Sequence, residues 1–255
     1  MKTVALPVVV LVSLTVTGCT LSRNPLYSPE VANSQLDLTG VWHRYDPVFH
    51  SDEKMSITKN PGGGFSFRLC AQDVAALLDA LRIERVRAIG LSMGAKTLLH
   101  LATALPARID TMVLVSATPR FPDSLRAAAA QFTPEAFDRL SEGELDTLRR
   151  RHVHGDGQLR ALYAMTRSFA TSEGDMAFTP DLLGQISART LIVHGDRDPL
   201  YPIEMALELF RGIPRSSLWI VPNAAHGPVF GPLAPEFARL AIAHLHVSKS
   251  SPHAS

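Results

Sequence analysis

The sequence predicts an α/β fold with a mostly parallel sheet, and three observations support this prediction. Short apolar runs typical of buried strands alternate with segments of helical periodicity along most of the 255 residues. A G-x-S-x-G turn stands between one such strand and one such helix. Residues 119–184 interrupt the alternation, because they contain helical patterns and no convincing strand. A chain of this length fits one domain with a sizeable core.

The first 19 residues have the composition of a targeting segment. A lysine follows Met1, and residues 4–16 are apolar but too few for a convincing transmembrane span. Residues 16–19, Val-Thr-Gly-Cys, resemble a bacterial lipobox. This resemblance implies a signal peptide, lipidation of Cys19, export, and a lipid anchor on the periplasmic or surface side of a bacterial membrane. An ordinary signal peptide with a chance cysteine is the alternative.

The elements expected after this segment follow in order. Residues 20–37 are polar, contain two prolines and suit an extended tether. The core is expected at 38–118 and 185–247. Its expected strands are 41–45, 54–58, 86–89, 111–115, 189–193 and 218–221. Its expected helices are 73–81, 95–102, 203–211 and 235–246. Cys70 is expected to be a small buried residue.

The intervening residues 119–184 are predicted to form four helices. These are 124–131, 134–140, 142–152 and 158–169, with Ser124, Thr133 and Ser141 as expected N-caps. Spaced apolar side chains in these helices are expected mainly to hold them together.

The turn Gly90-Leu91-Ser92-Met93-Gly94 indicates nucleophilic catalysis. A sharp strand-to-helix turn strains the backbone at Ser92, exposes its hydroxyl, and aims the Met93 N–H at a developing oxyanion. A serine hydroxyl is a poor nucleophile at neutral pH, so it needs a base, and the base needs an orienting group. Asp198 follows the strand at 189–193, and His226 follows the strand at 218–221. Asp196 is the alternative acid in the same loop.

These motifs resemble the α/β-hydrolase superfamily, and within it the esterase, lipase and proline-iminopeptidase-like branch. Gly195, Asp198 and Pro202 match that branch's G-x-x-D-x-x-x-P pattern, and Pro222 with His226 matches P-x-x-x-H. The resemblance implies a three-layer sandwich with a helical lid at 119–184. It also implies Ser92 as the nucleophile, His226 as the base and Asp198 as the orienting acid, with no cofactor.

One part of the family pattern is missing. The family's second oxyanion donor comes from a loop after the third strand, usually marked by His-Gly upstream of the nucleophile. Here no His-Gly pair precedes Ser92, so the second donor is unknown. Residues 35–67 are also short for the usual first strands, which are therefore expected to be reduced or missing. A natural deletion and an error in the gene model remain open explanations.

The leading prediction is a carboxylic-ester hydrolase that forms an acyl-enzyme with a small apolar ester. Serine at position 92 of the G-x-S-x-G turn, the nucleophile elbow, disfavours the dehalogenase and epoxide hydrolase members of the family, which use aspartate as the nucleophile. Peptidase, lactonase, perhydrolase and C–C hydrolase activities share the triad and stay open. The alternative class is an impaired or inactive hydrolase-fold binding protein without a full oxyanion hole. A formal net charge of +1 argues against nucleic acid as a partner. No metal site is expected, since His152/His154 and His244/His246 do not share a helix face.

Overall fold

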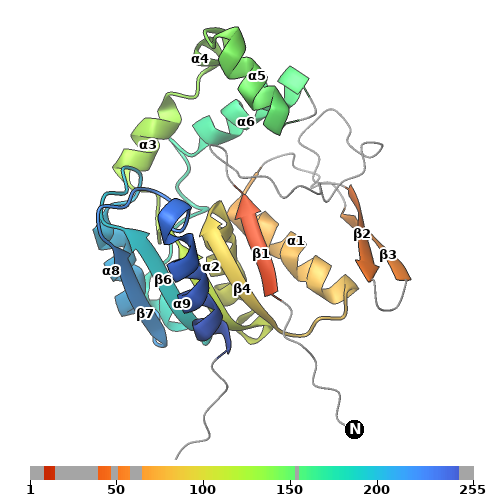
Figure 1. The fold of residues 1–255 in the computed structure, drawn as a ribbon, viewed down its shortest axis with the longest axis vertical. Coiled ribbons are helices and arrows are strands. Elements are labelled where there is room, and N and C mark those ends of the chain that lie inside the picture. Colours follow the sequence, from red (N-terminus) through yellow and green to blue (C-terminus); the bar gives the residue numbers. More distant parts are fainter. Residues whose placement is uncertain (1–8, 15–39, 47–50, 58–64, 153–154, 247–255) are drawn as a thin grey trace, which may run out of the picture.

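A parallel sheet forms the centre of the molecule (Figure 1). The computed structural model describes residues 9–14, 40–46, 51–57, 65–152 and 155–246. The sheet has five strands in the order β1-β4-β5-β6-β7, and each neighbouring pair is parallel. The strands are β1 (Val9–Leu14), β4 (Val86–Ser92), β5 (Ile109–Val115), β6 (Arg189–Gly195) and β7 (Ser216–Val221). The predicted α/β class is therefore confirmed.

Helices cover both faces of this sheet and produce a three-layer sandwich. One face packs against α1 (Phe67–Ala80), α2 (Met93–Ala104) and α8 (Ile203–Gly212). The other face packs against α9 (Ala234–His246). Side chains alternate between the two cores along β5, where Met112 and Leu114 face the first and Val113 and Val115 face the second. Apolar burial on both faces is typical of parallel strands.

Four helices between β5 and β6 lie beyond one end of the sheet, at the top of Figure 1. We call them the lid: α3 (Asp123–Ala130), α4 (Pro134–Asp138), α5 (Glu142–Arg151) and α6 (Gly155–Ser168). Thr133 and Ser141 cap their helices as predicted. Ser124 does not, because α3 begins at Asp123, directly after Pro122. A short helix that the sequence analysis missed, α7 (Pro180–Gly184), follows the lid.

The described residues before α1 form two separate pieces. β2 (Gly40–Asp46) and β3 (Ser51–Ile57) make an antiparallel hairpin beside α1 (Figure 1). β1 instead joins the central sheet next to β4, although its residues were predicted to belong to a signal peptide. A β-branched apolar run is compatible both with a strand of the sheet and with a signal peptide. Cleavage of a signal peptide would remove this strand. Cys19 and the tether at 20–37 lie outside the described residues, so lipidation stays a prediction.

No helix in the described part of the chain is long and apolar enough to cross a membrane.

Candidate active site

The turn after β4 holds Ser92 in a strained conformation. Ser92 ends β4 and is the N-cap of α2, with φ 50° and ψ −107°. Non-glycine residues rarely adopt a positive φ, and such strain clusters at functional sites. A Cβ on Gly90 would lie 2.6 Å from the Gly94 carbonyl oxygen. The close passage of backbone at this turn therefore requires glycine at position 90, as the motif predicted.

The structure brings Ser92, His226 and Asp198 together. The Ser92 Oγ lies 2.9 Å from Nε2 of His226, and Nδ1 of His226 lies 2.8 Å from Oδ2 of Asp198. An imidazole that donates from Nδ1 to a carboxylate leaves Nε2 as the acceptor for the serine proton. The three side chains come from the ends of three parallel strands, so the sheet itself sets their spacing.

Asp198, and not Asp196, occupies the position that orients the histidine. The Asp198 side chain is 0% exposed, and its Oδ1 accepts hydrogen bonds from the backbone N–H groups of Leu200 and Tyr201 at 2.8 and 3.1 Å. Burial acts to raise the pKa of Asp198, but the hydrogen bond and charge of His226 and these two N–H donors lower it below its ordinary value. Asp198 is therefore held as a carboxylate, while Asp196 is exposed to solvent.

Close backbone contacts fix the loop that carries His226. A Cβ on Gly195 would lie 2.3 Å from the carbonyl oxygen of Ala224 and 2.4 Å from that of Ala225. The N–H of Gly227 donates to Oγ of Ser116, at 3.0 Å, just after the end of β5. The histidine loop is thus held from both sides by the ends of neighbouring strands.

Met93 is the first residue of α2, so its backbone N–H has no partner within the helix. It lies at the positive end of the helix dipole and next to Ser92, where it can hold an oxyanion. β4 lies between β5 and β1 in the sheet, and Leu14 of β1 is the register partner of Ser92. The described residues between 38 and 64 form the separate hairpin, and the segment that follows Leu14 lies outside the described residues. The second oxyanion donor therefore stays unassigned.

Two residues that the sequence analysis did not single out contact this site. Lys96 lies on α2 with its side chain buried, and its Nζ donates a hydrogen bond to the Tyr201 hydroxyl. Burial raises the pKa of Tyr201, while a hydrogen bond with the Ser92 side chain opposes that rise. Tyr201 follows Asp198 by three residues, and its ring meets the His226 ring edge-on, with 5.0 Å between centroids. The buried His194, in β6, donates a hydrogen bond from Nε2 to the Tyr201 carbonyl at 3.0 Å.

Aromatic side chains fill the space between the sheet layer and the lid. Phe67 at the start of α1 stacks on Phe169, with ring centroids 5.6 Å apart, and both rings contact Phe121 after β5. These rings belong to the same apolar core as Met93. Asp175 supports them, because its carboxylate accepts from the N–H groups of Phe67 and Arg68 at the start of α1.

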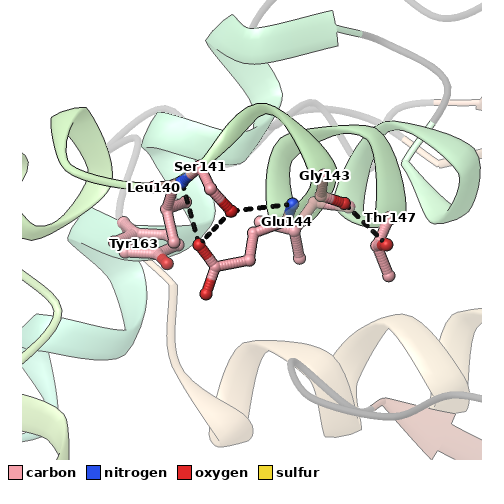
Figure 2. Close-up of a pocket in the computed structure, with 7 residues that line it drawn as sticks. Leu140, Ser141, Gly143, Glu144, Thr147 and Tyr163 are labelled. Atoms are coloured by element: carbon pink, nitrogen blue, oxygen red, sulfur yellow. Dashed lines mark hydrogen bonds between the residues drawn. The ribbon is translucent and has the colours of Figure 1, made fainter.

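A hollow of about 450 Å³ lies within the lid, and Figure 2 shows its lining. The lining is contributed by Leu140, Ser141, Gly143, Glu144, Thr147, Leu148 and Tyr163. Ser141 and Glu144 form a reciprocal capping box there, with the Ser141 N–H donating to Glu144 Oε2 at 2.8 Å (Figure 2). The Thr147 hydroxyl donates to the Gly143 carbonyl. These polar groups serve the start of α5, and the hollow is formed by the lid alone.

Comparison with known proteins shows the family to which this fold belongs. Residues 22–239 match the model of the Alpha/beta hydrolase family. The chain is 30% identical over 236 residues to 2-hydroxy-6-oxononadienedioate/2-hydroxy-6-oxononatrienedioate hydrolase 2 of Pseudomonas putida, covering 80% of this chain and 74% of that protein. It is 26% identical over 214 residues to pimeloyl-[acyl-carrier protein] methyl ester esterase of Nitrosomonas europaea, covering 74% and 84%.

Among solved structures, 2-hydroxy-6-oxo-6-phenylhexa-2,4-dienoate hydrolase from Rhodococcus sp. strain RHA1 has the same fold. The TM-score is 0.59 at 18% identity, over 71% of each chain. These relatives include both C–C bond hydrolases and esterases, so hydrolysis is the reaction class they share. The parallel sheet, the strained serine turn and the family match lead to one conclusion: the chain belongs to the alpha/beta hydrolase family.

Proposed function

We propose that this protein is a serine hydrolase that cleaves carboxylic esters through an acyl-enzyme on Ser92. The observation that supports this most strongly is the chain of two hydrogen bonds that links Ser92 to His226 and His226 to Asp198. In this mechanism His226 takes the serine proton as Oγ bonds to the acyl carbon, and then gives it to the leaving alcohol. Asp198 orients the imidazole and stabilises its positive charge. The Met93 N–H holds the oxyanion, and water then releases the acyl group.

The proposed substrate is a small ester with an apolar acyl group. The proposal is supported by the apolar core that adjoins the site at Met93, to which the rings of Phe67, Phe121 and Phe169 belong, because apolar surroundings favour apolar ligands. A second candidate is hydrolysis of a C–C bond next to a ketone, which the similarity to the Pseudomonas putida hydrolase favours. Both reactions can use the same nucleophile and base, so the triad alone does not separate them.

The two candidates are separated by their substrates. The full chain and Ser92→Ala are assayed on p-nitrophenyl esters of increasing acyl length, and on 2-hydroxy-6-oxo-6-phenylhexa-2,4-dienoate. Turnover of the esters that is lost in Ser92→Ala supports the ester proposal. Serine-dependent turnover of the dienoate with no ester turnover replaces it with C–C hydrolysis. Activity retained in Ser92→Ala contradicts both.

A further inference from the structure

The neighbouring strands β4 and β5 each lead into a serine with a left-handed backbone. Leu91 and Val115 are register partners in the two strands, and Ser92 and Ser116 are the residues that directly follow them. The φ angle is 50° at Ser92 and 48° at Ser116. Non-glycine residues adopt this region at a cost, and residues held in it cluster at functional sites. The proposed mechanism explains the strain at Ser92 and gives no role to Ser116.

Two consecutive residues of the histidine loop hydrogen bond to these two serines. Nε2 of His226 lies 2.9 Å from Ser92 Oγ. The backbone N–H of Gly227 donates to Ser116 Oγ at 3.0 Å. Ser116 is fully buried, and its own N–H donates to the Val193 carbonyl of β6 at 2.9 Å. Its hydroxyl is therefore an acceptor, anchored at the end of the sheet, for the chain that leaves His226.

This acceptor fixes the peptide group that joins His226 to Gly227. A peptide group is planar, so the Gly227 N–H and the Cα of His226 lie in one rigid plane. Gly227 has a φ of 72°, and its carbonyl accepts from the N–H of Val229 at 2.8 Å, so the chain turns sharply just after this plane. A hydrogen bond to the Gly227 N–H thus sets the orientation of the backbone from which the imidazole projects. Without the acceptor the plane can rotate, and Nε2 then moves away from Ser92 Oγ.

The hydroxyl, and not the backbone, explains a serine at position 116. Glycine adopts a positive φ without the steric cost that a Cβ brings, so the backbone alone would favour glycine here. Glycine, however, would leave the Gly227 N–H without this acceptor. The hydrogen bond that holds the loop before His226 runs from the Arg197 N–H to the Ala224 carbonyl at 2.9 Å, between backbone groups. The contact after His226 depends on a side chain, so a substitution can remove it.

We propose that Ser116 is a positioning residue for His226. Its hydroxyl oxygen holds the peptide group that follows the histidine, while Asp198 holds Nδ1 of the ring, and the two contacts together keep Nε2 at the Ser92 hydroxyl. A general base must stay within hydrogen-bond reach of the proton that it takes. The inference rests on the proposed function, because it assigns a role only if Ser92 is the nucleophile and His226 its base.

The test measures how fast a fluorophosphonate probe labels Ser92 in the full chain over a range of probe concentrations. This separates the maximal labelling rate from the half-saturating concentration. Ser116→Ala removes the hydroxyl and keeps the Cβ, whereas Ser116→Gly removes both the hydroxyl and the backbone strain. Each variant should lower the maximal rate about tenfold, the effect expected of one lost hydrogen bond, and leave the half-saturating concentration unchanged. Ser116→Gly should nevertheless melt at a higher temperature than Ser116→Ala, because glycine accepts the positive φ.

Ser187→Ala is the matched control, because the Ser187 hydroxyl also bonds a backbone group, the Pro106 carbonyl at 3.2 Å. Ser187 precedes β6 and so lies at the opposite end of the sheet from the triad, and its variant should label at the wild-type rate.

A folded Ser116→Ala that labels at the wild-type maximal rate would overturn the proposal while leaving the serine nucleophile intact. A purely structural role predicts that labelling follows stability, so Ser116→Gly labelling at the wild-type rate would also overturn it. No labelling of wild type would overturn both this inference and the proposed function. Ser116→Gly relieves the strain, so the test stands even if Ser116→Ala folds poorly.

Discussion

Replacing Gly195 with alanine should disrupt the geometry between Asp198 and His226. The new Cβ would lie 2.3 and 2.4 Å from two backbone carbonyl oxygens in the loop just before His226. Carbon–oxygen contacts normally stay beyond ~3.3 Å, so the two loops must separate by roughly 1 Å. Overpacking of this kind costs about 1–3 kcal/mol of unfolding free energy, and a misplacement of that size in catalytic groups costs about 10²-fold in rate.

The assay combines the fluorophosphonate labelling rate with the melting temperature. Gly195→Ala should label about 100-fold more slowly and melt several degrees lower than wild type. Gly143→Ala is the matched control, because no atom lies within 4 Å of its added Cβ and it lies in α5. That substitution should leave labelling unchanged and stabilise the helix by about 0.5–1 kcal/mol. Wild-type labelling by Gly195→Ala would refute the claim that this contact fixes the triad.

Three further predictions concern the acid, the buried lysine and the edge strand. Asp198→Asn should slow labelling by about 10⁴-fold, whereas Asp196→Asn should not change it; equal rates for the two variants would contradict the assignment. Lys96→Met should raise the free energy of unfolding most below pH 7. The pKa of Lys96 is about 7 in the folded protein and 10.5 in its ordinary state. Burial of its charge therefore lowers the free energy of unfolding by its full amount below pH 7, and this destabilisation disappears as the pH rises toward 10.5. Urea unfolding at two pH values measures this, and a less stable variant at acidic pH would refute it. Deleting residues 1–14 should lower the melting temperature if Val9–Leu14 is the strand beside β4; an unchanged melting temperature would instead favour a signal peptide.

The parts of the site that sequence analysis predicted are encoded locally. The elbow around Ser92 needs only a strand, a tight turn and a helix in succession, and all three can be recognised within a short stretch of sequence. The choice of Asp198 over Asp196 followed from the family resemblance, because Gly195 and Asp198 match the spacing of its G-x-x-D-x-x-x-P pattern. The structure explains that spacing, because Gly195 approaches the histidine loop too closely for a side chain and Asp198 follows at the turn.

The parts that sequence analysis missed depend on distant segments. Lys96 has an ordinary place in a helical pattern, and only packing against Tyr201, 105 residues later, makes it a buried cation. Asp175 closes the start of α1 from 108 residues away. The assignment of Val9–Leu14 depends on whether an apolar run pairs with β4, and the composition of such a run suits a strand and a signal peptide equally.

The central claim, that Ser92 is an activated nucleophile, is tested most directly by intact-mass analysis after exposure to a fluorophosphonate probe. The account predicts one adduct on the wild-type full chain, located on Ser92 and absent from Ser92→Ala. The probe requires an activated serine and no knowledge of the substrate. A folded wild-type protein that acquires no adduct, or acquires one on another residue, would contradict the account and favour a binding protein built on a hydrolase fold.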